Sequence, residues 1–188
     1  MMNKPETKLL YATLERRILA GERKADIYAT CLDETEAKRC AKLLAQIPTP
    51  ARRSQYRLLN GIIVADIAVL ALIKLLVVSL VVLTEIPKGF LLILLAPLIN
   101  LFILWQVAKF RAIGYLLVIA FGLTGLSRVI EGFQKSMDGL DLALNSVSLA
   151  CVVSAMILAF LLMRKLLPQT SLLLNPKTDS AGRPQFEN

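Results

Sequence analysis

The sequence predicts an all-α polytopic membrane protein, with a four-transmembrane-helix bundle preceded by a short helical N-terminal cytoplasmic head. Hydrophobic residues occupy 56% of the positions, which is too apolar for an ordinary soluble domain. Four apolar runs have about the length that a helix needs to cross a hydrocarbon core of roughly 30 Å. We therefore expect a cytoplasmic head over residues 1–57, a bundle over 58–165 and a cytoplasmic tail over 166–188.

The head carries apolar side chains at helical spacing and no long apolar run. We expect three short helices, the first stopped at Gly21, where glycine permits a left-handed backbone, and the third stopped at Pro48. Each helix has one apolar side, so the three can close on one another or lie against the bilayer surface. The apolar positions of the first and third helices are Leu10, Leu14, Ile18, Ala37, Cys40, Ala41, Leu44 and Ile47.

The first membrane span is the nearly unbroken apolar run over 60–83. Thr49 and Pro50 resemble a helix start, and no breaker follows them before the run, so one helix is expected from Pro50 to Leu83. Such a helix would join the head rigidly to the bundle. Three arginines precede the span and mark its cytoplasmic end, namely Arg52, Arg53 and Arg57.

Three further spans follow. The second, over 89–107, contains Pro97, near which we expect a kink. The third runs over 112–131, and a polar outer loop over 132–139 connects it to the fourth, over 140–163. In the tail that follows, turn-forming residues allow either a small hairpin or disorder.

Flanking side chains indicate the orientation and the packing of these spans. Trp105 and Tyr115 are expected as an aromatic pair at the cytoplasmic interface. Small residues in the third span permit close helix packing, and these are Gly114, Gly122 and Gly125. Both termini are expected in the cytoplasm, because the basic residues on that side (52, 53, 57, 109, 111, 164, 165) outnumber those outside (88, 128, 135).

Lys74, together with Asp66, is the best candidate for a functional residue, because an ionisable side chain at membrane depth costs at least ~2.5 kcal/mol unless it is paired or wetted. At 1.5 Å per residue it lies at nearly the depth of Asn145 on the fourth span. One hypothesis is an outward-facing polar pocket of Lys74, Asp141 and Asn145, with Arg128 and Glu131 paired at its mouth, that binds or passes a small polar or anionic species. The other is a Lys74–Asp141 pair that only fixes helix packing. The fourth span supports both with a polar and small face that holds Asp141, Asn145, Ser148, Ala155 and Ala159.

Asp66 and Asn100 complete the candidate intramembrane polar site. Asp66 lies about 9 Å from the cytoplasmic edge, which makes a proton-coupled role conceivable. Asn100 lies one turn beyond Pro97 and suits an interhelical hydrogen bond. The expected partners of Asp66 are Arg57, Lys109, Arg111 and Gln106.

Several kinds of chemistry are not expected. The chain has no histidine, and we find no phosphate-binding loop, dinucleotide fingerprint or nucleophile elbow, so we predict no enzyme activity, cofactor or metal. Cys31, Cys40 and Cys151 lack metal-ligand spacing, and the first two are expected as core thiols. The net charge of +8 lies beside the spans, where anionic lipid and topology explain it without nucleic acid.

One resemblance adds to this reading. The segment GERKADIYATCLDETEAKRCAKLLAQIPTP, the apolar bundle after it and a tail with Pro176, Asp179, Gly182 and Phe186 resemble small uncharacterised bacterial inner-membrane proteins with a helical cytoplasmic head. The resemblance implies an inner-membrane location and this architecture, and no activity. The expected role is a non-enzymatic anchor or regulatory protein in the lipid bilayer. Residues 1–57 can bind a cytoplasmic protein partner, and the chain can form a homo-oligomer. The alternative is a small solute or ion conduit at Lys74.

Overall fold

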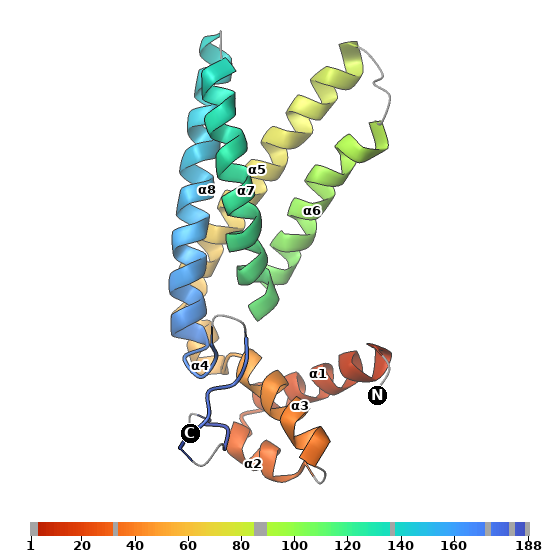
Figure 1. Ribbon diagram of the computed structural model, residues 1–188, viewed down its shortest axis with the longest axis vertical. Helices are drawn as coiled ribbons and strands as arrows, with labels where there is room; N and C mark the ends of the chain where they lie inside the picture. The colour runs from red at the N-terminus through yellow and green to blue at the C-terminus, as the bar shows by residue number, and fades with distance from the viewer. Residues whose placement is uncertain are drawn as a thin grey trace. The chain divides into compact units, whose positions relative to one another are not determined.

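Helices make up most of the chain in the computed structural model, which describes residues 4–31, 34–84, 90–135, 138–171, 174–180 and 183–186 (Figure 1). Within these residues the secondary structure is helical apart from two isolated β-bridges, as the all-α prediction requires. The helices are α1 (Lys4–Leu19), α2 (Lys24–Ala29), α3 (Glu34–Gln46), α4 (Pro50–Gln55), α5 (Arg57–Thr84), α6 (Phe90–Ala108), α7 (Ala112–Lys135) and α8 (Gly139–Leu166). The chain divides into two units, which we call the head–tail unit (1–57 with 163–188) and the bundle (58–162).

The first three helices close on one another around an apolar core. α1 and α2 are separated by Gly21, whose φ of +93° is the left-handed conformation predicted for the stop. The apolar sides of α1, α2 and α3 meet and exclude water, and burial of this kind is what stabilises short helices that are marginal alone. The buried cluster consists of Leu14, Ile18, Ile27, Cys40, Leu44 and Ile47.

The tail packs against this core and is part of the same unit, although the sequence suggested a separate segment. The Phe186 ring lies 5.3 Å from that of Tyr28, measured between centroids, and contacts the buried cluster. The Gln46 side chain donates a 3.1 Å hydrogen bond to the Leu174 carbonyl. In place of a regular hairpin, the tail forms two isolated antiparallel bridges, Thr170 to Pro176 and Thr178 to Pro184.

The single helix expected from Pro50 to Leu83 is wrong, because the helix breaks at Tyr56. There φ is −103° and ψ is 14°, and α4 ends before α5 begins. Two arginines hold α4 within the head–tail unit. The Arg53 guanidinium lies 2.7 Å from the Glu15 carboxylate of α1, and Arg52 donates to the Lys165 carbonyl. These contacts fix the direction of α4, so it need not continue the axis of α5.

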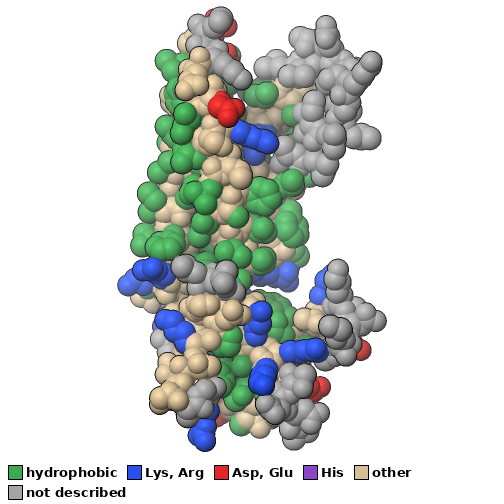
Figure 2. Space-filling model, viewed as in Figure 1, with side chains coloured by type: hydrophobic (Ala, Val, Ile, Leu, Met, Phe, Trp, Pro, Cys, Tyr) green, Lys and Arg blue, Asp and Glu red, His purple; other side chains and the backbone are tan. Residues whose placement is uncertain are grey.

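Three helices of the described chain are long and apolar enough to cross a membrane: Arg57–Ser79 of α5, Ala112–Gln134 of α7 and Gly139–Leu166 of α8. The segment expected as the second span forms α6, in which Pro97–Ala108 is a shorter apolar helix. Hydrophobic side chains cover much of the visible face of the bundle (Figure 2). A surface that is apolar over most of a helix length suits lipid and not water, so the chain is a membrane protein.

The outer loop expected over 132–139 is largely helical. α7 continues through Glu131 to Lys135, and α8 begins at Gly139. A Cβ placed at Gly132 would lie 2.9 Å from Oδ1 of Asn145 on α8, so this glycine leaves room for the Asn145 side chain beside the end of α7.

Glycines of α7 bring it close to both neighbours, as predicted. A Cβ at Gly114 would lie 2.8 Å from the Val107 backbone nitrogen at the end of α6. A Cβ at Gly122 would lie 2.4 Å from the Met156 side chain of α8. Gly125 is different, because its nearest atom would be a Val152 methyl group at 4.0 Å.

A polar cluster ties the start of α5 to α6 and α7. The Tyr115 hydroxyl donates a 2.6 Å hydrogen bond to Oδ1 of Asn60, and the Asn60 amide donates at 3.2 Å to the Val107 carbonyl. Tyr115, which was expected at the interface with Trp105, is fully buried within the bundle. The reason is that Asn60 gives the hydroxyl a partner inside the bundle, which removes the cost of burying it.

Replacement of Gly114 by alanine is predicted to destabilise the bundle. The new methyl group would meet backbone atoms that cannot move independently, and overpacking of this kind costs about 1–3 kcal/mol. Gly61→Ala is the matched control, since a Cβ there has no neighbour within 4 Å and alanine favours the helix. Thermal unfolding of the detergent-purified chain should show a lower Tm for Gly114→Ala only. Equal Tm values for the two variants would contradict the close approach of α6 and α7.

Candidate functional site

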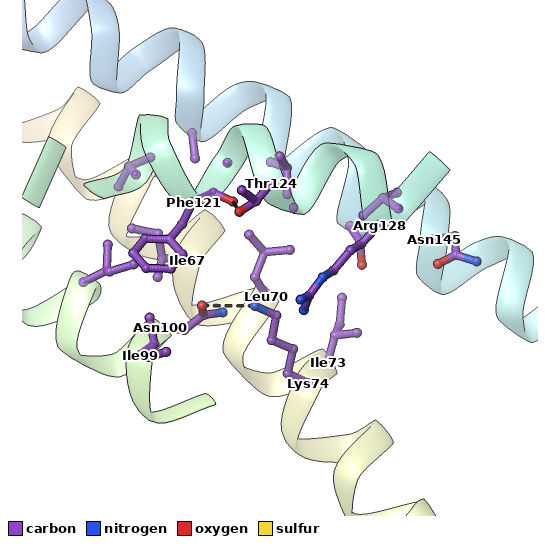
Figure 3. A pocket seen from close by; sticks show the side chains of 18 residues that line it. Ile67, Leu70, Ile73, Lys74, Ile99, Asn100, Phe121, Thr124, Arg128 and Asn145 are labelled. Atoms are coloured by element: carbon purple, nitrogen blue, oxygen red, sulfur yellow. Dashed lines mark hydrogen bonds between the residues drawn. The ribbon is translucent and has the colours of Figure 1, made fainter. Parts of the chain in front are cut away.

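A cavity of about 480 Å³ lies among the four helices of the bundle (Figure 3). Its volume falls within the ~300–1,000 Å³ that is usual for small-molecule sites. Every helix of the bundle contributes both polar and apolar side chains to the wall. The polar and charged members are Lys74, Asn100, Thr124, Arg128, Asn145 and Ser148, and the apolar members include Ile67, Leu70, Ile103, Val118, Phe121, Val152 and Ala155.

Two cations from different helices meet at this cavity. Lys74 of α5 donates a 3.1 Å hydrogen bond from Nζ to Oδ1 of Asn100 on α6. Arg128 of α7 extends toward the same space, close enough for its charge to act on Lys74 (Figure 3). Both side chains are exposed at the surface of the bundle. Like charges repel, so this arrangement is unfavourable unless something neutralises it.

Neither cation has a carboxylate partner within the described part of the chain. The ion pairs Arg17–Glu22, Arg23–Asp26 and Arg53–Glu15 lie in the head–tail unit, and none of them involves Lys74 or Arg128. Asp141 and Glu131, the acids expected near the cavity, are exposed and do not line it. Arg128 accordingly turns into the cavity, and the expected pair with Glu131 does not form.

The partner predicted for Lys74 was Asp141 or Asn145 of α8, and the structure corrects this to Asn100. Lys74 and Asn145 both line the cavity, but Asn145 lies against Gly132 at the end of α7. Depth along the helices was therefore an insufficient criterion, because it does not say which sides of α5 and α8 face each other. The interhelical hydrogen bond expected of Asn100 is present, with Lys74 as its donor.

Asp66 lies on α5 two turns before Lys74 and does not line the cavity. Its Oδ2 atom is buried and has no hydrogen-bond partner among the described residues. The predicted partners in the bundle are engaged elsewhere, since Arg111 donates at 3.4 Å to Gln106, and Lys109 and Arg111 lie 4.5 and 4.8 Å from the Trp105 ring centroid. Nothing in the described chain places a second carboxylate beside Asp66, so a proton relay has no further member.

One of the three cysteines, Cys40, lies in the core of the head–tail unit. All three are free, and the described residues contain no cluster of three metal-ligating side chains. Cys40 is 1% exposed, and its burial, together with a hydrogen bond to Cys31, raises the pKa of the Cys40 thiol to about 12. The thiol therefore remains protonated at neutral pH and behaves as an apolar core group, as predicted.

The arrangement at the cavity is suited to holding an anion. Lys74 supplies an ammonium group and Arg128 supplies a planar guanidinium, which binds carboxylate or phosphate with two parallel hydrogen bonds. Because Oδ1 of Asn100 accepts from Lys74, its amide N–H groups can donate to the same anion. Thr124 also lines the cavity and was not predicted, although its i,i+4 spacing from Arg128 places both on one side of α7.

A double-mutant cycle tests the Lys74–Asn100 hydrogen bond. Asn100→Leu alone should lower the unfolding free energy by about 1–3 kcal/mol, because it leaves a lysine without its acceptor inside the bundle. Lys74→Met in the same chain should recover part of that loss, since the two residues are coupled. Tm measured in detergent for the two single variants and the double variant gives the coupling. Strictly additive effects would show that the hydrogen bond contributes nothing to stability.

Comparisons with known proteins assign no family to the chain. No family model, no curated protein and no solved structure matches it. Its function is therefore inferred from the chemistry of the cavity and the apolar helices.

Proposed function

We propose that this chain is a non-enzymatic integral membrane protein whose bundle binds an anion, or an anionic group of a larger molecule, between Lys74 and Arg128. The observation that carries the proposal is the convergence of two cations and one amide donor on a cavity of about 480 Å³, with no carboxylate partner in the described chain. A bound anion would relieve the repulsion between the cations and satisfy the free amide donors.

The surroundings strengthen this interaction. Lys74 and Arg128 lie on helices with an apolar surface, where the effective dielectric constant is lower than in water. The attraction between opposite charges is stronger in such a place than at a protein surface in water. The free-energy cost of leaving a charge unpaired is also higher there. This asymmetry favours a ligand-filled site over an empty one.

Binding is favoured over conduction. The cavity is bounded by the four helices of a single bundle, and four helices enclose little lumen. A conduit would require a homo-oligomer or a large separation of the helices.

A second candidate function belongs to the head–tail unit, as a cytoplasmic docking module for a protein partner. The observation that favours it is the exposure of large apolar side chains on α1, where Leu9 is 70% and Leu19 is 47% exposed. A partner that covered these leucines would gain the free energy of burying their apolar surface. Docking and anion binding involve different units and are compatible.

The proposed topology has four crossings of the bacterial inner membrane, with α6 as the second and both termini in the cytoplasm. Support comes from the three long apolar helices, from α6 between two of them, and from the cations that lie over Trp105 at the end of α6. Aromatic and basic side chains together are typical of a cytoplasmic interface.

Reporter fusions test this topology. Alkaline phosphatase, which is active only outside the cytoplasm, should be active after residues 86 and 136 and inactive at residue 188. A fluorescent protein that folds only in the cytoplasm should give the opposite pattern. An active phosphatase at residue 188 would contradict a cytoplasmic C-terminus and with it the proposed topology.

Anion binding is predicted to stabilise the purified chain. In lipid nanodiscs, acetate or inorganic phosphate exchanged for chloride at constant ionic strength should raise the Tm, and a ligand at 100 times its Kd adds about 2.7 kcal/mol of stability. Lys74→Met and Arg128→Met should each abolish the rise. Lys109→Met is the matched control, because this lysine lies over Trp105 and outside the cavity. An equal loss in all three variants would indicate general screening and refute a site.

A further inference from the structure

The polarity of the cavity changes along its length, and from this we infer the class of ligand. We propose that the site takes a single-chain amphiphile, with its anionic head between Lys74 and Arg128 and its acyl chain in the apolar part of the cavity. This inference rests on the proposed function and adds the chemical class of the ligand.

The division into a polar and an apolar part recurs on the helices that line the cavity. Along α7 the wall passes from Arg128 and Thr124 to Phe121 and Val118, and along α5 it passes from Lys74 to Leu70 and Ile67. α8 runs in the opposite direction to α7, and its wall passes from Asn145 and Ser148 to Val152 and Ala155. The polar members of these helices therefore lie toward one end, where Ile73 and Val129 also line the wall, and the other end is lined by apolar side chains alone.

The apolar part is long enough for a chain. Ten residues separate Val118 from Arg128 and seven separate Ile67 from Lys74, which at 1.5 Å per residue correspond to about 15 and 10 Å along the helices. A small anion such as acetate would occupy only the polar end. The remaining wall would face either lipid that enters the cavity or the hydrocarbon part of the ligand itself, whose burial contributes about 0.8 kcal/mol per methylene group.

The cations are reachable from outside the bundle. Lys74 and Arg128 are exposed although they lie on apolar helices, so the polar end opens at the surface of the bundle. An amphiphile dissolved in the bilayer presents its head near the interface and its chain below it. It can therefore enter from the side, with no passage through an aqueous lumen.

A substitution at Gly125 can test binding of the acyl chain separately from binding of the anionic head. It lines the cavity, and a Cβ there would meet only a Val152 methyl group at 4.0 Å, so a leucine side chain can be added without a clash at its first atom. The added side chain would occupy space needed by the chain and leave Lys74, Arg128 and Asn100 unchanged. Gly61→Leu is the matched control, because that position has no neighbour within 4 Å and does not line the cavity.

The experiment compares four probes on the full chain in nanodiscs: laurate, dodecyl phosphate, dodecanol and acetate. Native mass spectrometry and thermal shift measure binding. The wild type and Gly61→Leu should bind laurate or dodecyl phosphate at least about tenfold more tightly than acetate, since two buried methylene groups suffice for that factor. They should also bind these anions about tenfold more tightly than dodecanol, because only a charged head pairs with Lys74 and Arg128. A preference between laurate and dodecyl phosphate identifies carboxylate or phosphate as the head. Gly125→Leu should lose about tenfold or more in affinity for the chain-bearing anions and keep the acetate shift.

Three outcomes would overturn the inference. Equal affinity for laurate and acetate would show a site for small anions only, and the proposed function would stand. Equal affinity for dodecanol and laurate would show an apolar chamber in which the cations play no part. A wild type that responds to no probe would refute the proposed function together with the inference.

Discussion

A charged side chain on an apolar helix needs polar partners, and the arrangement of the bundle meets that requirement. Hydrocarbon cannot solvate the Lys74 ammonium group, so another helix must supply a hydrogen-bond acceptor. α6 does so through Asn100, which forms a contact between α5 and α6 at the level of Lys74. Near the start of α5, Asn60 performs the corresponding task with Tyr115 and Val107. These two polar contacts, at Asn100 and at Asn60, therefore hold the helices together. Apolar contacts alone would do so poorly, because lipid solvates separated apolar helices equally well.

Small residues determine which helices approach most closely. Gly114 permits contact between α7 and the backbone of α6, and Gly122 and Gly132 permit contact with side chains of α8. α7 is thus the element against which its two neighbours pack. Gly125 of α7 has no such close neighbour, and the cavity lies beside it. The same residue type therefore accounts for both the tight contacts and the open space.

Much of the fold could be predicted from the sequence, because apolar length and helical spacing are local properties. The stop at Gly21, the core face of α3 and the close packing of α7 follow from residues within a few turns of one another. The break at Tyr56 could not be predicted, since it depends on Arg53 meeting Glu15, which lies 38 residues earlier. The partner of Lys74 and the burial of Tyr115 were missed for the same kind of reason. Spacing and depth place a side chain on its own helix, and the rotation of the neighbouring helix decides what it touches.

The packing of Phe186 beside Tyr28 bears on the order of events during synthesis. A ribosome makes α1 to α3 first, then the long apolar helices that the insertion machinery must place in the bilayer, and the Phe186 codon is read only after all of them. Domains generally begin to fold as they emerge from the ribosome. The head therefore begins to fold before Phe186 is available to pack against its core. Its final packing waits for a segment translated after α8. The head is completed only in chains whose hydrophobic helices have already been synthesised, so its resistance to proteases in the cell would report on full-length translation.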